Sequence, residues 1–116
     1  MKIIKTFIKG LIVITNKKFV DNRGYFREVL LEKIIKKKFI FNVVSHSKKN
    51  VIRGIHFQEK KPQGKFISVI KGKIIDVAVD LRKNSKTYGK HFKIILSERN
   101  CTSVYIPTGF AHGFGG

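Results

Sequence analysis

Short runs of β-branched and aromatic residues recur along this chain of 116 residues, and residues that favour turns separate them. Such runs predict β-strands, because branched and aromatic side chains fit the pleated surface of a sheet. The predicted strands are two short ones within 2–20, one that starts at Tyr25, and then 39–44, 51–57, 66–70, 73–81, 92–96 and 103–106. Only 32–38 has helical character, for one or two turns. Strands at this spacing with so little helix predict an all-β sandwich or barrel.

The chain has the length and composition of one globular domain over residues 1–116. Hydrophobic residues make up 42%, and no linker, repeat or low-complexity segment divides the sequence. Cys101 is the only cysteine, which excludes an internal disulfide and predicts an intracellular protein. No apolar run is long enough for a signal-peptide core or a membrane span. We therefore expect a cytoplasmic protein that does not bind a membrane.

The formal net charge of +18 is compatible with nucleic-acid binding, but the residue types argue against it. The excess is almost all lysine and accompanies many isoleucines and asparagines, as codon bias in an AT-rich genome would produce. Arginine, which makes the better bidentate contacts with bases and phosphates, occurs only five times. We expect no nucleic-acid partner, and a basic nucleic-acid-binding barrel stays an alternative. The charge would also attract an anionic substrate such as a nucleotide diphosphate.

Two histidines and one lysine stand where a ligand would have room. In a strand, His56 shares a face with Gly54, which leaves space beside the ring. In 106–114, the pattern Pro-x-Gly-x-x-His sets a turn and then places His112 among small residues. Lys65 follows a turn and starts a strand, so a hairpin would bring it beside the first histidine. The alternatives are a hydrogen-bonded histidine at a barrel mouth and a surface lysine.

A further segment, 19–28, combines a turn with charged residues. Arg23 has the fork-shaped group that binds a diphosphate, and Glu28 would accept hydrogen bonds from a sugar or a base. The alternative is a plain turn with a surface ion pair.

Together these segments form an ordered set of motifs. The motifs are Phe-x-Asp-x-Arg-Gly-x-Phe-x-Glu from Phe19, Val-Ile-Arg-Gly-Ile-His-Phe-Gln from Val51, Gln-Gly-Lys from Gln63, Asp-Val-Ala-Val-Asp-Leu-Arg from Asp76, and Ile-Pro-x-Gly-Phe-Ala-His-Gly-Phe from Ile106. In this order and spacing, the sequence resembles the dTDP-4-dehydrorhamnose 3,5-epimerase family from end to end of the chain. The resemblance implies a cupin-type jelly-roll barrel and a homodimer that exchanges strands between subunits.

The resemblance also implies roles for the matching residues. His56 would be the base that removes protons next to the keto group at carbon 4 of dTDP-4-dehydro-6-deoxyglucose, and Lys65 would stabilise the enolate oxygen that forms. Asp80 would lie near the histidines and tune them. The residues that would hold the nucleotide diphosphate and the sugar are Arg23, Glu28, Arg53 and His112. The product would be dTDP-4-dehydrorhamnose for cell-surface polysaccharide. No cofactor is expected, because the keto group already acidifies both neighbouring carbons.

Metal binding is the usual alternative for a cupin, and the sequence disfavours it. A metal cupin would carry a His-x-His pair with a following Glu, whereas Phe57 and Gln58 follow His56. Two histidines without a third ligand do not make a metal site, so we expect none.

The sequence departs from the family pattern at two places. Val43 stands where the family has an asparagine, and the sequence ends at Gly116, before the family's tyrosine that donates a proton to the opposite face of the sugar. We therefore expect a jelly roll that is incomplete at its C-terminus and lacks that donor, the closing strands and the acid that pairs with the catalytic histidine. Two other functions stay open: an epimerase that inverts a single carbon, and an inactive truncated module that still binds a nucleotide sugar.

Overall fold

The structure, a computed structural model, describes residues 2–30, 45–49, 52–56 and 64–116. In these residues it has strands, turns and loops but no helix, so none that could cross a membrane. The strands are β1 (Lys2–Lys5), β2 (Ile12–Thr15), β3 (Lys18–Asp21), β4 (Gly24–Arg27), β5 (Ile52–His56), β6 (Lys65–Ser68), β7 (Lys73–Asp80), β8 (His91–Ser97), β9 (Thr102–Ile106) and β10 (Phe110–Gly115). The all-β prediction is confirmed. The predicted helical turn over 32–38 and strand over 39–44 lie outside the described residues.

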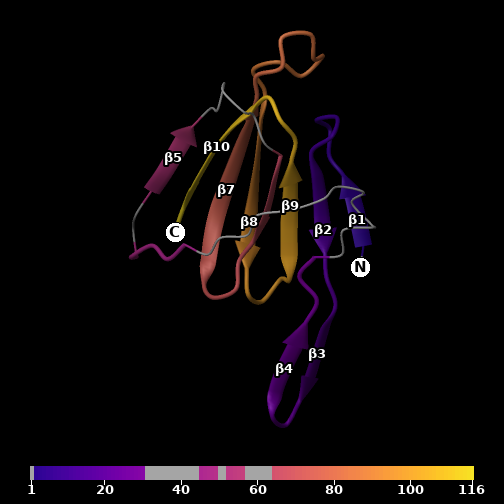
Figure 1. The fold of residues 1–116 in the computed structure, drawn as a ribbon, viewed down its shortest axis with the longest axis vertical. Coiled ribbons are helices and arrows are strands. Elements are labelled where there is room, and N and C mark those ends of the chain that lie inside the picture. Colours follow the sequence, from indigo (N-terminus) through magenta and orange to yellow (C-terminus); the bar gives the residue numbers. More distant parts are fainter. Residues whose placement is uncertain (1, 31–44, 50–51, 57–63) are drawn as a thin grey trace.

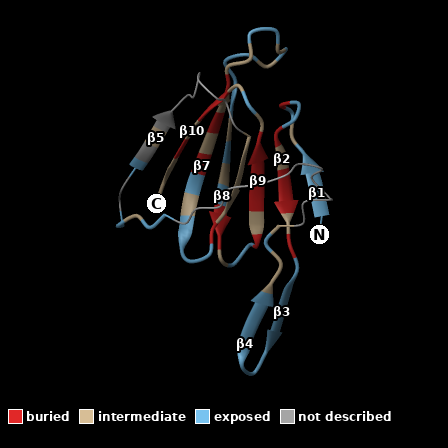
Figure 2. Cartoon of the chain, in the orientation of Figure 1, coloured by how far each residue is buried: buried red, intermediate tan, exposed pale blue. Residues whose placement is uncertain are grey.

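Two four-stranded antiparallel sheets form the body of the molecule (Figure 1). One has the strand order β1-β2-β9-β6, and the other has the order β5-β10-β7-β8. Both sheets contribute side chains to one hydrophobic core, together with the loop after β1. The core residues are Ile8, Leu11, Val69, Ala78, Leu96, Val104, Ile106 and Phe110. Buried residues lie mainly on the central strands of the two sheets (Figure 2). The architecture is therefore a sandwich with its core between the layers.

Strand β7 directs polar side chains into this core. Its burial alternates along the strand, and the residues on its fully buried side are Asp76, Ala78 and Asp80. Alternation follows from the geometry of a strand, in which successive side chains point to opposite faces. Buried carboxylates are rare unless each has a partner. The hydrogen-bond partners of these two aspartates therefore indicate the role of each carboxylate in this part of the sandwich.

Strand β10 is absent from the strands that the sequence predicts. Its residues, Phe-Ala-His-Gly-Phe-Gly, include two glycines and an alanine, which are poor strand formers. In the structure, β10 lies between β5 and β7 and pairs with both. Hydrogen bonding to two neighbouring strands therefore outweighs the weak local preference, and it places His112 in the middle of a sheet.

Strands β3 and β4 form a separate hairpin that extends away from the two sheets (Figure 1). The predicted turn at 21–24 is confirmed. The backbone N–H of Arg23 donates to Asp21 Oδ1 at 2.8 Å, and Gly24 has a φ of 134° that favours glycine. The hairpin thus presents its charged turn to solvent at one end of the molecule.

The prediction of two short strands within 2–20 is confirmed by β1 and β2, and the structure adds the start of β3 in the same stretch. The interruption between β2 and β3 is at Asn16. Its side-chain amide donates to the backbone carbonyls of Glu28 at 2.6 Å and Val29 at 2.5 Å. This buried asparagine bonds to the chain just after β4 and so fixes the base of the hairpin. The pattern of apolar residues alone does not indicate this contact.

Candidate active site

The centre of β10 brings predicted site positions together. In the antiparallel register, His112 lies opposite His56 of β5 on one side and opposite Ala78 of β7 on the other. Residues directly opposite in such a ladder have their Cα atoms about 4.5–5.5 Å apart. Arg53 lies opposite Phe114 on the same pair of strands. The backbone thus gathers three of the seven predicted site residues on two adjoining strands.

The ring of His112 is held by a buried carboxylate. Its Nε2 lies 2.7 Å from Oδ2 of Asp76, whose side chain is 2% exposed while that of the histidine is 10% exposed. A carboxylate accepts hydrogen bonds, so the proton belongs on Nε2. In the neutral ring, Nδ1 is then an acceptor, and in the charged ring it is a second donor. The pair can therefore orient the ring and exchange a proton through its other nitrogen.

Sequence reasoning passed over Asp76, although a signal for it exists. The segment Asp-Val-Ala-Val-Asp places its two acids an even number of residues apart, hence on the same face of a strand. The structure shows that this is the buried face. What the sequence does not contain is the register of β10, which decides which acid meets the histidine.

Asp80 lies at the end of β7 and is 0% exposed. Its Oδ1 accepts from the backbone N–H of Arg82 at 3.0 Å and from its Nε at 3.0 Å, while Nη2 of that arginine donates to Oδ2 at 3.1 Å. The hydroxyls of Ser85 and Thr87 each donate to Oδ2 at 2.6 Å. These bonds all come from the loop that follows β7. The carboxylate that bonds to His112 is Asp76.

Two opposing effects act on the pKa of Asp80. Burial disfavours the charged form and would raise the pKa. The hydrogen bonds from Arg82, Ser85 and Thr87 favour the charged form and together outweigh burial. The net result is a pKa well below the ordinary value of 3.8, so the group is a permanent anion at neutral pH.

Arg82 connects this network to the turn that precedes β10. Its guanidinium carbon lies 4.8 Å from the centre of the Phe110 ring, a cation–π contact. Gly109 has a φ of 89°, and a Cβ there would lie 2.6 Å from Arg82 Cγ. The carbonyl of Gly109 accepts from the backbone N–H of Leu81 at 3.0 Å. The arginine therefore lies across the turn, at a position that only a glycine leaves open.

Lys65 begins β6, in the sheet that faces β5 and β10. The prediction that a hairpin places it beside His56 is wrong, because β6 pairs with β9 and not with β5. The chain passes from one sheet to the other between these residues, as is common in a sandwich. The lysine is half-buried, and the glycine before it packs so closely on the Tyr105 hydroxyl that no side chain would fit there.

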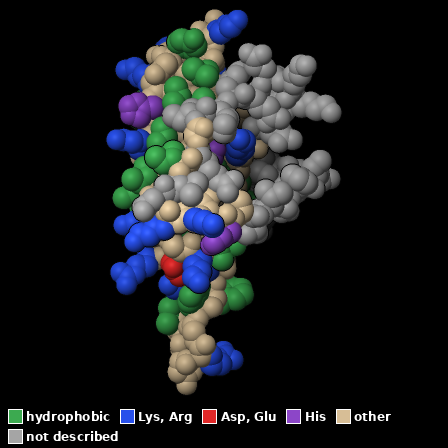
Figure 3. Space-filling view, turned by 90° about the vertical axis from the view of Figure 1, so that its left-hand side faces the viewer, with side chains coloured by type: hydrophobic (Ala, Val, Ile, Leu, Met, Phe, Trp, Pro, Cys, Tyr) green, Lys and Arg blue, Asp and Glu red, His purple; other side chains and the backbone are tan. Residues whose placement is uncertain are grey.

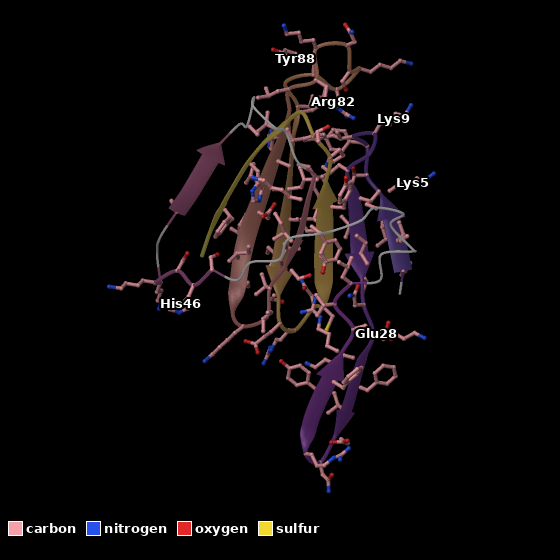
Figure 4. All side chains as sticks on the ribbon, in the orientation of Figure 1. Lys5, Lys9, Glu28, His46, Arg82 and Tyr88 are labelled. Carbon is pink, nitrogen blue, oxygen red and sulfur yellow. The ribbon has the colours of Figure 1, made fainter. Side chains whose placement is uncertain are left out.

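The two candidate residues of the hairpin lie apart from β10. Arg23 is at the tip, where its side chain is 87% exposed and pairs with Asp21 at 2.9 Å. The side-chain hydrogen bond from this arginine lowers the pKa of Asp21. Glu28 is half-buried at the base of the hairpin, and Arg82 lies near the opposite end of the sheets (Figure 4). In one copy of the chain, the hairpin extends away from the sheet that contains β10 (Figure 1).

The described residues contain no cluster of three or more His, Cys, Asp or Glu side chains that would hold a metal ion. Both buried acids of β7 have hydrogen-bond donors as partners instead. The arrangement is suited to proton transfer and to binding of a polar ligand.

Comparison with known proteins gives one consistent result. The profile of the dTDP-4-dehydrorhamnose 3,5-epimerase family matches residues 5–115. The dTDP-4-dehydrorhamnose 3,5-epimerase of Methanothermobacter thermautotrophicus is 48% identical to this chain, and the matched region covers 97% of this chain and 64% of that protein. The chain thus spans about two thirds of the length of the curated relatives it matches.

Solved structures agree in fold. The dTDP-6-deoxy-D-glucose-3,5-epimerase of Legionella pneumophila, in complex with dTDP-4-keto-L-rhamnose, has a TM-score of 0.92 and 41% identity over 98% of this chain and 64% of that one. The dTDP-4-dehydrorhamnose 3,5-epimerase of Bacillus anthracis, with TDP and PPi bound, has a TM-score of 0.90 and 37% identity over 98% of this chain and 69% of that one. The cupin-type jelly roll implied by the sequence is confirmed.

Proposed function

Since the chain belongs to the dTDP-4-dehydrorhamnose 3,5-epimerase family, we propose that it inverts carbons 3 and 5 of dTDP-4-dehydro-6-deoxyglucose to give dTDP-4-dehydrorhamnose. The Legionella pneumophila relative holds dTDP-4-keto-L-rhamnose, a product of the same kind. The observation that carries the proposal is the register of β10, which sets His56 opposite His112 while Asp76 holds the ring of His112.

The reaction needs a base but no redox partner. The keto group at carbon 4 acidifies the C–H bonds at carbons 3 and 5. A base takes the proton, and the electron pair of the broken bond moves to the keto oxygen as an enolate. A proton from water, delivered to the opposite face, restores the ketone with the carbon inverted, and the base returns its proton to the solvent. We assign the base to His56, because a histidine exchanges protons near neutral pH. Atoms and charge balance without a cofactor.

We assign the stabilisation of the enolate to Lys65. The enolate oxygen carries the charge that develops in the transition state, and a fixed cation in a site shielded from water stabilises such a charge strongly. The half-burial of this lysine, at the start of a strand in the sheet that faces β10, supports the assignment. A fully exposed lysine would be screened by solvent.

We assign binding of the substrate to His112 and Arg53, on the strands that also carry the base. Because Asp76 fixes one nitrogen of the histidine ring, the other nitrogen is free to bond with a sugar hydroxyl or a phosphate oxygen. Arginine is the residue that binds phosphate in bidentate fashion. Asp80 is assigned to the support of this region and not to contact with the sugar, since its described hydrogen bonds all lead into its own loop.

Arg23 and Glu28 would serve the site of a second copy. Both belong to the hairpin, whose tip lies away from β10 in its own chain. Phe19 and Phe26 of the hairpin are 52% and 68% exposed, with ring centres 6.3 Å apart. Large exposed apolar groups at one place favour an interface. We therefore propose a homodimer in which the hairpin of one copy contacts the other copy and brings its charged residues to the nucleotide.

The charge of the chain supports an anionic substrate. The formal net charge is +18, and lysine and arginine side chains are spread over the face shown in Figure 3, with apolar side chains between them. Such a surface raises the local concentration of a nucleotide diphosphate sugar. Cytoplasmic location and a role in cell-surface polysaccharide belong to the same proposal, supported by the single cysteine and by the reaction product.

The experiment that tests the proposal is deuterium uptake into dTDP-4-dehydro-6-deoxyglucose in deuterium oxide, followed by mass spectrometry. The wild-type chain is compared with His56→Ala and with His91→Ala, which removes an exposed histidine on β8. We expect uptake that His56→Ala abolishes and His91→Ala leaves unchanged.

The amount of label separates the alternatives. Uptake of two deuterium atoms per sugar supports epimerisation at both carbons, and uptake of one indicates an epimerase for a single carbon. Binding of the substrate without uptake would contradict catalysis by this chain and indicate a module that binds a nucleotide sugar. Uptake that survives in His56→Ala would overturn the assignment of the base.

A further inference from the structure

Two buried carboxylates of β7 lie on the same face of the sheet as His112. His112 lies opposite Ala78, while Asp80 lies opposite Phe110 and Asp76 lies opposite Phe114. The two acids therefore flank the histidine diagonally, one on each side. Diagonal neighbours on one face of an antiparallel pair are about 7–8 Å apart, a distance that long or aromatic side chains bridge. The ring of His112 bonds to Asp76. A physical difference between the two acids must therefore favour Asp76 over Asp80 as its partner.

The difference between the acids is Arg82. Its Nε and Nη2 occupy both oxygens of Asp80, and the hydroxyls of Ser85 and Thr87 take further places on Oδ2. An ionised carboxylate has about four acceptor positions, and Asp80 accepts five bonds once the backbone N–H of Arg82 is included, so its positions are fully occupied. A charge-assisted, bidentate pair is also the strongest competitor that a histidine could meet. Asp80 is therefore not free to accept from His112.

The same arginine fixes the start of the strand that carries the histidine. Its aliphatic stem lies against Gly109, where a Cβ would clash with Cγ, and its guanidinium lies over the ring of Phe110. A Cβ on Gly10 would meet its Nη1 at 3.6 Å, so the guanidinium also packs near a loop of the other sheet. Because His112 follows Phe110 by two residues, a shift of this turn would shift the ring relative to both acids.

We propose that Arg82 is a positioning residue for His112: by occupying Asp80 and fixing the turn at Gly109, it directs the histidine ring to Asp76 and its other nitrogen to the ligand. The role of the ligand rests on the proposed function, whereas the choice between the two acids rests on the register of β7 and β10 and on the bonds of Arg82.

The test compares Arg82→Ala and Arg82→Lys with Lys83→Ala, which removes an exposed charge from the next residue of the loop. Two quantities are measured at a temperature where circular dichroism shows each variant folded. One is the nitrogen and proton NMR signature of the His112 ring, and the other is the dissociation constant for dTDP. We expect Arg82→Ala to shift the Nε2 signature and to weaken dTDP binding about tenfold, the equivalent of one hydrogen bond. Arg82→Lys should lie between, and Lys83→Ala should match the wild type.

A second arm tests the competition itself. Asp76→Asn alone leaves the histidine without a carboxylate. In the Arg82→Ala background, Asp80 loses the two guanidinium bonds but keeps those from the backbone N–H, Ser85 and Thr87. One acceptor position then opens to the ring, so the loss of dTDP affinity caused by Asp76→Asn should be smaller than in the wild type. Such non-additivity is the sign of sites that share a partner. If the two substitutions weaken dTDP binding by independent factors that simply multiply, the proposed competition between Asp76 and Asp80 for the ring is refuted.

The remaining outcomes are also decisive. A lower thermal midpoint with an unchanged His112 signature would mean that the arginine only stabilises the fold, and it would overturn the proposal. If Arg82→Ala does not fold, Arg82→Lys carries the same two readouts. If the wild type binds no dTDP, the proposed function fails at that point, while the ring signature still decides whether Arg82 positions the histidine.

Discussion

The two buried aspartates of β7 are chemically identical and four residues apart, yet their surroundings differ completely. Asp80 accepts five hydrogen bonds, all from the loop that follows its own strand. Asp76 has one described side-chain bond, and it comes from His112 on another strand. Asp80 therefore stabilises its own loop, whereas Asp76 holds the imidazole ring of His112, which is itself partly exposed. The comparison teaches that burial of an acid does not identify a functional site, whereas the nature of its partner does.

The difference also separates stability from function. A carboxylate that its own loop saturates stabilises that loop whether or not a ligand is present. A carboxylate that holds a single imidazole contributes one hydrogen bond to stability, but it sets the protonation and the direction of a group that meets the ligand. Variants of the two acids should therefore affect different measurements.

The largest effect is expected from Asp80→Ala. The change leaves the guanidinium of Arg82, which is 30% exposed, without its counter-charge, and it removes the carboxylate to which the hydroxyls of Ser85 and Thr87 donate, so that among the described residues these two hydroxyls keep only each other as acceptors. Removal of one partner of a buried pair costs about 3 kcal/mol or more. The free energy of unfolding, measured by urea denaturation, should fall by about that amount. A loss below about 1 kcal/mol would place this pair among ordinary surface ion pairs and break the comparison.

Asp76→Asn should show the opposite balance. The amide has nearly the same shape, so we expect a cost of only about 1 kcal/mol in unfolding free energy, the net value of one hydrogen bond. The ring of His112 loses its anion, and substrate-dependent deuterium exchange should fall about tenfold to a hundredfold. Exchange rates and urea midpoints are measured on the same samples. Equal stability losses for this variant and for Asp80→Ala would contradict the division of roles.

Much of the fold follows from the sequence because strand signals are local. The prediction of a strand over 73–81 agrees with β7, and the prediction over 103–106 agrees with β9, since β-branched residues repeat there on a short period. Strand β10 escapes prediction because its glycines and alanine carry no such signal, and it forms through pairing with β5 and β7. Sequence patterns therefore predict strands with a strong local β preference. They do not predict a strand such as β10, which forms because two neighbouring strands pair with it.

The site divides in the same way. His112 is predictable from its turn pattern, because Gly109 and the small residues around it are a local feature. The choice of Asp76 as its partner is not predictable, because alternation puts Asp76 and Asp80 on the same face and only the register of β10 distinguishes them. The sequence pattern predicts a hairpin that brings Lys65 beside His56, and this hairpin is wrong because β5 and β6 belong to different sheets. Long-range pairing is the information that the sequence pattern lacks.

The pH dependence of stability should carry the mark of Asp80. Its pKa is lower in the folded chain than in the unfolded chain, so the unfolded state takes up the proton first as the pH falls. The stability that this group contributes is complete above about pH 5 and is lost progressively as the pH falls below 4 toward the folded pKa, by up to about 1.4 kcal/mol per pH unit. The difference in unfolding free energy between wild type and Asp80→Asn should therefore shrink on acidification. A difference that stays constant from pH 7 to pH 3 would contradict the depressed pKa.

The smallest effect is expected at Asp21, the hairpin acid that resembles Asp80 in sequence terms, since an arginine follows each by two residues. Asp21 accepts from the backbone N–H and from Nη2 of its arginine, but the side chains of both residues are more than half exposed. Solvent and salt screen such a pair, so Asp21→Asn should leave the urea midpoint of the monomeric chain unchanged within error. Sedimentation of the same variant separates the two places where the pair could act. A lower urea midpoint of the monomer would mean that an Asp–Arg pair of this kind stabilises the chain whether or not it is buried. The contrast between the exposed pair at Asp21 and the buried pair at Asp80 would then fail. A change confined to self-association would instead locate the role of the pair at the contact that the hairpin makes with a second copy.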